Sequence, residues 1–92
     1  MYLVIVSPEA TLFQGEVNAV SVPGVQGSFQ VLNNHAAIVS SLSVGEAKIE
    51  GNIDVADAFK SLFTKKGNDT SVSLSNGGTF EMSNNKAILF VD

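Results

Sequence analysis

The 92-residue sequence contains no cysteine, no tryptophan and no arginine, and its only histidine is His35. Without cysteine, no disulfide can form and no thiolate can bind a metal or act as a nucleophile. The five lysines include one adjacent pair, Lys65 and Lys66, and the net charge is −4. Because binding to nucleic acid or to an anionic membrane through charge needs a basic face, this composition argues against both.

Charged side chains are also scarce, at 15% of the residues against 45% that are apolar. A small domain of this composition cannot easily cover its surface with polar groups, so we expect a partner protein to cover part of it. A surface rich in serine and asparagine is the simpler alternative. The opening segment, Met1–Val6, lacks the charged start and cleavage site of a secretory signal, and no apolar run reaches the about 18 residues of a membrane-spanning helix. Together with the lack of cysteine, this favours the cytoplasm.

Most of the chain alternates between apolar and polar residues with the period of two that is typical of strands. Tyr2–Val6 is apolar at every position, which predicts a strand buried on both faces. Between Val17 and Val22 the apolar positions slip by one residue, which predicts a β-bulge near Ala19. Residues 46–50 alternate cleanly and predict a strand with one face in water.

The last third of the chain predicts three antiparallel strands joined by short turns at Asn76-Gly77 and Asn84-Asn85. Residues 54–64 do not fit this pattern, because their apolar side chains have helical spacing. We predict one short helix there, capped by Asp54 and ended by Lys65, Lys66 and Gly67. The alternative is an irregular segment whose aromatic side chains plug the core. The fold class is thus mostly β, a small β-sandwich of antiparallel strands in a single domain, residues 1–92.

The sequence contains no pattern that predicts catalysis, a cofactor or a metal site. His35 has no Gly-x-Ser-x-Gly turn to accompany it, and Asp54 and Asp57 lack the glycine and distal glutamate of a calcium loop. The glutamates mostly alternate with apolar residues, as side chains on the wet face of a strand do. Two alternatives stay open: a small hydrolase that uses His35, and a sandwich that binds a carbohydrate or metabolite. The absence of tryptophan argues against the second.

The order of several motifs resembles the N-terminal domain of the epsilon subunit of F-type ATP synthase. These motifs are Ser7-Pro8-Glu9, Leu12-Phe13-x-Gly15-x-Val17, Pro23-Gly24-x-x-Gly27-x-Phe29, His35-Ala36 and Gly45. The resemblance covers residues 1–50 well and 77–92 fairly, but it does not extend to 52–70.

The resemblance implies a non-catalytic rotor subunit of the central stalk, peripheral on the cytoplasmic face of the bacterial inner membrane. Such a subunit links the gamma subunit to the c-ring and couples rotation driven by hydrogen or sodium ions to ATP synthesis. Family members usually continue into a helical C-terminal domain, so we expect its inhibitory helices to be absent from this chain. By matching positions, the resemblance implies gamma-subunit contacts at Ser7, His35 and Ser40, and c-ring contacts at Gln26, Gly27 and Ser28.

This chain departs from the family pattern at both predicted contact regions. Asn33-Asn34 and Ala37 stand where the family often has Pro-Gly and Pro around the histidine. Gln26 and Ser28 stand where acidic residues are common, so charge pairing with the c-ring should be weaker. Asparagine tolerates turn conformations, so the loop around His35 is expected to keep its shape.

Overall fold

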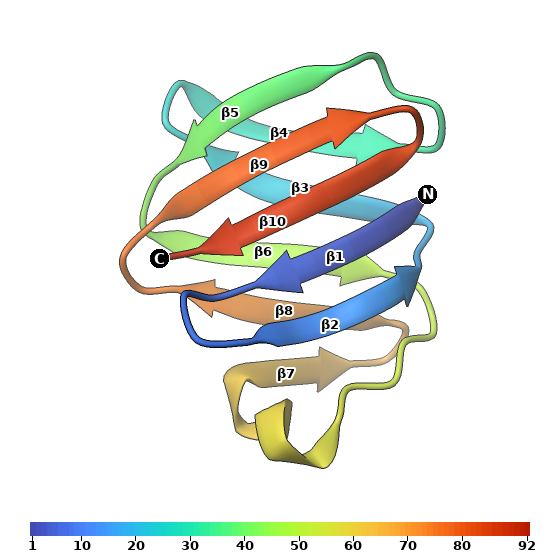
Figure 1. Ribbon diagram of the computed structural model, residues 1–92, viewed down its shortest axis with the longest axis vertical. Helices are drawn as coiled ribbons and strands as arrows, with labels where there is room; N and C mark the ends of the chain where they lie inside the picture. Colours follow the sequence, from blue (N-terminus) through green and yellow to red (C-terminus); the bar gives the residue numbers. More distant parts are fainter.

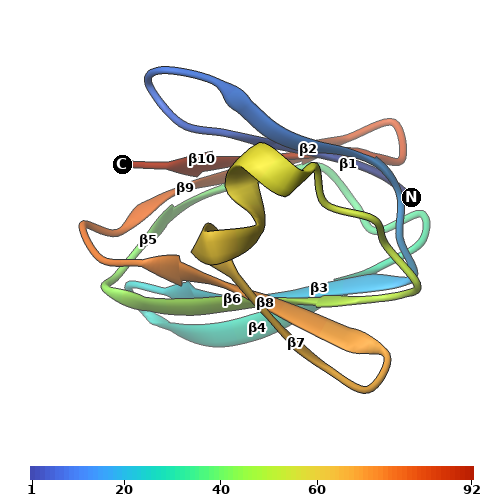
Figure 2. The same cartoon turned by 90° about the horizontal axis from the view of Figure 1, so that it is seen from below.

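The structure, a computed structural model, describes residues 1–92 as ten strands and one short 3-10 helix (Figure 1). The strands are β1 (Tyr2–Val6), β2 (Thr11–Glu16), β3 (Ala19–Gly24), β4 (Gly27–Leu32), β5 (Ile38–Leu42), β6 (Gly45–Glu50), β7 (Phe63–Lys66), β8 (Asp69–Leu74), β9 (Gly78–Ser83) and β10 (Lys86–Val91); the helix η1 spans Asp57–Leu62. They form two layers, β2-β1-β10-β9-β5 and β4-β3-β6-β8-β7, which face each other in Figure 2. The predicted β-sandwich is therefore confirmed.

The two layers are two halves of one curled sheet, because β5 also pairs with β3 through Gly24 and Leu42. All strand pairs are antiparallel except one: β1 runs parallel to β10, with Tyr2 opposite Lys86 and Val6 opposite Phe90. The first and last strands of the chain thus lie side by side in the middle of one layer (Figure 1). No helix is long and apolar enough to span a bilayer.

The core lies between the layers and is built from alternate residues of the facing strands. At its centre Phe80 is fully buried, and the Phe29 ring meets it edge-on, with ring centroids 6.3 Å apart. Strand β1 contributes only Leu3 and Ile5, both fully buried. Its other residues are half-buried on the outside, so the expectation that β1 is buried on both faces is wrong.

The parity slip near Ala19 is a crossing between layers, and the predicted bulge is absent. Strand β2 ends at Glu16, and β3 begins in the opposite layer at Ala19. The backbone N–H of Val17 donates to the Met1 carbonyl at 2.9 Å, and that of Asn18 donates to the Glu50 carbonyl at 2.8 Å. Because the chain changes layers between these bonds, the buried parity changes as well.

The three C-terminal strands are present, but only the last two are paired with each other. Asn84 and Asn85, with φ of 52° and 59°, form the turn of the β9–β10 hairpin, as predicted. Strand β8 instead pairs with β6 and β7, while β9 pairs with β5 and β10. The turn at Gly77 therefore changes layers, and glycine is needed there because its φ is 74° and a Cβ would lie 2.6 Å from the Leu42 carbonyl oxygen.

The predicted helix at 54–64 is a shorter 3-10 helix, and its predicted ends are wrong. Ala56 occupies the N-cap position and makes no side-chain capping bond, so Asp54 does not cap the helix. Lys65 and Lys66 belong to β7, which is antiparallel to β8. The ladder with β8 takes up these residues, which stops the helix at Leu62. Half-buried Val55, Phe59 and Phe63 pack against the core, as in the alternative of an aromatic plug.

Candidate functional site

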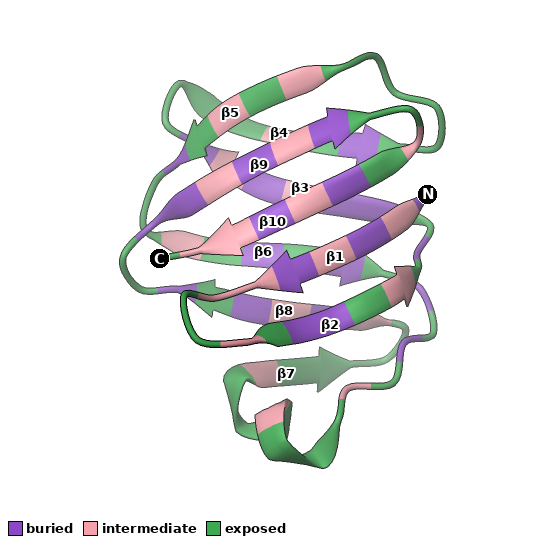
Figure 3. Cartoon of the chain, in the orientation of Figure 1, coloured by how far each residue is buried: buried purple, intermediate pink, exposed green.

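The outer surface of the layer β2-β1-β10-β9-β5 is apolar across its central strands. Cross-strand pairing aligns Val39, Glu81, Ile88, Val4 and Gln14 in one outward row. The outward rows on either side of this one contain the pair Phe90 and Val6 and the pair Tyr2 and Lys86. We call this surface the apolar face: Tyr2, Val4, Val6, Val39, Ile88 and Phe90. Figure 3 shows its half-buried positions alternating with buried ones along β1 and β10.

The outer surface of the other layer is polar. Its outward positions on β3, β4, β6 and β8 pair across the strands, with Lys48 between Ser21 and Ser71, and Glu46 opposite Ser73. Lys48 and Asp69 form an exposed ion pair at 3.8 Å. We call this surface the polar face: Ser21, Gln30, Glu46, Lys48, Ser71 and Ser73. The sandwich therefore presents two chemically different sides.

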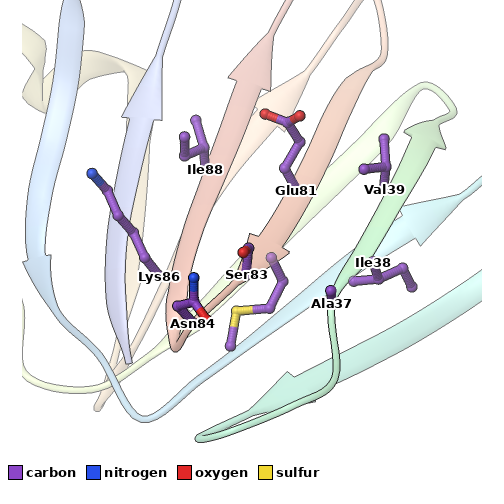
Figure 4. Close-up of a pocket in the computed structure, with 9 residues that line it drawn as sticks. Ala37, Ile38, Val39, Glu81, Ser83, Asn84, Lys86 and Ile88 are labelled. Atoms are coloured by element: carbon purple, nitrogen blue, oxygen red, sulfur yellow. The ribbon is translucent and has the colours of Figure 1, made fainter.

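A hollow of about 630 Å³ lies on the apolar face, over β5, β9 and β10. Figure 4 shows Val39 and Ile88 on either side of Glu81, while the Lys86 side chain extends away from that carboxylate. Met82 also lines the hollow. Glu81 has no ion pair and no side-chain hydrogen bond. The one carboxylate of the hollow thus stands between two apolar side chains, and Ser83, Asn84 and Lys86 are also part of the lining.

The residues predicted to contact the gamma subunit lie far apart. Ser7 follows β1, where its hydroxyl and N–H both interact with Ala10 and shape the turn into β2. His35 lies in the loop before β5 at the opposite end of the sandwich, where the neighbouring Asn34 N–H donates to Asn85 Oδ1 at 2.8 Å. Ser40 pairs with Phe80 and so lies on the inward side of β5. A partner that touches both Ser7 and His35 must span the layer, and Ser40 does not share the outward side of that layer.

The residues predicted to contact the c-ring lie together. Gln26 is in the β3–β4 turn, and Gly27 and Ser28 open β4, where Gly27 has a φ of 130° that favours glycine. All three are exposed. Gln26, Gly27 and Ser40 line one hollow of about 470 Å³, so Ser40 groups with these residues and not with His35. Two exposed apolar side chains, the apolar tips, lie at this end: Val25, 60% exposed in the same turn, and Val44, 69% exposed in the β5–β6 loop.

His35 has no constellation that would support catalysis. Its exposed ring places Nδ1 2.7 Å from the Ala36 carbonyl oxygen, and no serine or carboxylate hydrogen-bonds to it. No three metal-binding side chains converge anywhere in the chain. A hydrogen bond from Lys60, reinforced by its charge, lowers the pKa of Asp57, and both side chains are exposed on η1. Lys60 also lines a hollow of about 520 Å³, together with Ile53 and Phe63.

The apolar face is a candidate functional surface that sequence reasoning missed. Its signal was present in β1, where both parities are apolar. This pattern predicts burial on both sides, because a strand in the middle of a covered sheet has the same pattern. Only the topology shows that one parity of β1 is on the outside.

Comparison with known proteins gives relatives that all have the same description. The family model described as ATP synthase, Delta/Epsilon chain, beta-sandwich domain matches residues 1–92. The ATP synthase epsilon chain of Chlorobaculum tepidum is 36% identical over 88 residues, which are 96% of this chain and 84% of the relative. That of Leptospira interrogans is 32% identical over 96% of this chain but only 58% of its own length.

A solved structure shares the fold. It is a chain of the Tetrahymena thermophila mitochondrial ATP synthase, from a structure of the central stalk and c-ring. The TM-score is 0.70 at 15% identity, and the match covers 98% of this chain and 61% of that one. The sandwich, the family model over the whole sequence and the similar epsilon chains agree: this chain belongs to the ATP synthase delta/epsilon chain β-sandwich family.

Proposed function

We propose that this chain is a non-catalytic subunit of the central stalk of an F-type ATP synthase, where it joins the gamma subunit to the c-ring. In this role it transmits ion-driven rotation and supports ATP synthesis without reacting itself. The observation that carries the proposal is the unequal chemistry of its two outer surfaces, in a chain whose relatives are ATP synthase epsilon chains.

The apolar face is the surface that suits a permanent protein partner. Interface cores are depleted in lysine, glutamate and aspartate and enriched in aromatic side chains. This face carries the aromatic side chains of Tyr2 and Phe90, and its charged side chains are few: Glu16, Glu81 and Lys86. From β1 to β5 the layer is three strand spacings wide, about 14 Å at about 4.8 Å each. A standard interface of about 800 Å² per partner covers such a surface, and it would reach from Ser7 to the loop of His35.

The c-ring contact is proposed at the end of the sandwich that carries Gln26, Gly27 and Ser28. This end holds the exposed turn between β3 and β4 and the apolar tips Val25 and Val44. With no charge on these three residues, contact with polar c-ring loops would rest on hydrogen bonds and on the fit of the two tips. The same role places the chain at the cytoplasmic side of a bacterial membrane, held there by its partners.

The core supports a mechanical role. Nineteen buried residues form one apolar cluster between the layers. Protein interiors packed in this way have low compressibility and transmit strain. A rotor part that connects two neighbours needs such stiffness more than it needs a reactive group.

The experiment is co-purification of the whole chain with the gamma subunit encoded in the same genome. Val39, which is 72% exposed, is changed to Asp on the apolar face. Ser73→Asp, on the polar face, is the matched control. We expect the wild type and Ser73→Asp to form a stoichiometric complex with gamma and Val39→Asp to lose it, while circular dichroism shows all three folded.

Failure of the wild-type chain to associate with gamma would overturn the proposed function. Equal loss of binding in both variants would overturn the assignment of gamma to the apolar face. The alternative of a carbohydrate- or metabolite-binding module gains nothing from the relatives, whose names all describe epsilon chains.

A further inference from the structure

The hollow on the apolar face is lined by nine residues, five of them apolar, and its one carboxylate is unpaired. Val39 and Ile88 flank Glu81 in the same cross-strand row, and Met82 contributes to the floor. Glu81 is half-buried, while Val39 is 72% exposed. The walls are therefore available to a partner, and the carboxylate stands between them.

Covering this surface with a purely apolar partner would be costly. A carboxylate removed from water without a cation or hydrogen-bond donors loses several kcal/mol of solvation free energy. A partner that docks on the apolar face must therefore supply a group that pairs with Glu81. The chain itself does not supply it, because no lysine lies within ion-pair distance of this carboxylate.

We propose that the hollow receives one lysine or arginine side chain of the gamma subunit, with its cation on the Glu81 carboxylate. This inference rests on the proposed function. The aliphatic stem of the incoming side chain packs between Val39 and Ile88, as long basic side chains do along apolar surfaces. Its charged end reaches Glu81 and replaces the water that the docking removes.

Lys86 sets the direction in which the basic side chain enters. It lines the same hollow, but its side chain extends away from Glu81 (Figure 4). Its positive charge disfavours a second cation at that end of the hollow. The incoming cation therefore enters from the side of Val39 and ends at Glu81.

Such a contact would act as an anchor that fixes register. Buried basic and aromatic side chains in pockets near the centre of an interface carry a large share of binding free energy. The surrounding apolar contacts are non-directional, whereas a carboxylate–cation pair has one position. Glu81 therefore determines where gamma sits along the layer.

The test measures the affinity of the whole chain for purified gamma by titration calorimetry at low and at high salt. Glu81→Gln keeps the shape and removes the charge, and Glu81→Lys reverses it. Glu46→Gln, on the polar face, is the matched control. We expect Glu81→Gln to weaken binding about tenfold or more, Glu81→Lys to weaken it further, and Glu46→Gln to leave it unchanged. The salt dependence should shrink in Glu81→Gln.

A second arm tests the apolar walls. Val39→Ala should weaken binding about threefold to tenfold with unchanged salt dependence, because it removes stem contacts and leaves the ion pair. Restoration of Glu81→Lys binding by an acidic substitution at one basic residue of gamma would identify the partner side chain.

The possible failures are distinguishable. If the wild type binds gamma but Glu81→Gln binds within about twofold of it with the same salt slope, the anchor is overturned and the proposed function stands. If the wild type does not bind gamma, the proposed function is overturned too. Concentration-dependent dimers of the wild type that Glu81→Lys abolishes, without any gamma binding, would assign the face to a second copy and overturn the proposal.

Discussion

The two outer surfaces of the sandwich differ although the two layers share one core. On the apolar face both parities of β1 and β10 are apolar except at Lys86, so these strands can be covered on both sides. On the polar face β6 alternates strictly, with Ala47 and Ile49 inside and Glu46, Lys48 and Glu50 outside. The comparison teaches that the few charged side chains are not spread evenly. They are scarcest on the layer that a partner is proposed to cover.

Truncating the side chain at the centre of the shared core should have the largest effect on stability. This effect should not distinguish the two faces. Phe80 is fully buried and contacts Phe29 edge-on. We expect Phe80→Ala to lower the free energy of unfolding by about 3–5 kcal/mol, because it leaves a cavity between the layers. Urea denaturation measures this change, with Val39→Ala as a surface control. A loss below about 1 kcal/mol would contradict the shared core.

Aromatic truncation on the apolar face should separate binding from folding. We expect Phe90→Ala to weaken the gamma complex about tenfold to a hundredfold, since interface aromatics are frequent anchors. Lys48→Ala, on the polar face, should leave the affinity unchanged. Calorimetry with gamma gives both values, and a reversed order would exchange the roles of the faces.

Removing one buried hydroxyl beneath the polar face, that of Thr70, should stabilise the fold. The Thr70 side chain is 2% exposed, and its hydroxyl has no hydrogen-bond partner. We expect Thr70→Val to raise the free energy of unfolding by about 1 kcal/mol, because an unpaired buried hydroxyl is destabilising. Thr70→Ser keeps the hydroxyl and should give no gain. Destabilisation by Thr70→Val would mean that the hydroxyl is paired in solution.

The smallest effect is expected at the exposed pair on η1. A hydrogen bond from Lys60, then its charge, lowers the pKa of Asp57, and the bond is 2.9 Å long. A carboxylate whose pKa is lower in the folded state than in the unfolded state stabilises the fold at pH values above its unfolded-state pKa. This contribution is lost as the pH falls through the folded-state pKa. Carbon-detected NMR should show Asp57 titrating below its usual range, and Lys60→Met should raise that midpoint. At neutral pH Asp57→Asn should scarcely change stability, because the pair is exposed.

Local patterns predicted the parts of the fold that local physics determines. The Asn84-Asn85 turn was predicted because asparagine tolerates positive φ, and 46–50 because alternation reports one wet face. The errors at Ala19 and Gly77 share a cause. At both places the chain changes layers, and no pattern within a few residues distinguishes such a crossing from a bulge or a hairpin turn.

The site was less predictable than the fold. The resemblance supplied Ser7, His35, Ser40 and the Gln26–Ser28 turn as contact positions, and these stay predictions. Glu81 reads in sequence as one more wet-face carboxylate between Phe80 and Met82. Its special position depends on Val39 and Ile88, which come from other strands. Long-range register produces that neighbourhood, so the residues around Glu81 in the sequence do not reveal it.

The parallel pairing of β1 with β10 has a consequence for biosynthesis. Residues 2–6 leave the ribosome early, yet their neighbour on one side consists of residues 86–90, which are made much later. Until then β1 has only β2 beside it, and a lone two-stranded hairpin is marginally stable in water. The layer that is proposed to hold gamma is therefore complete only once β10 has been made, so assembly with the rotor must await that strand.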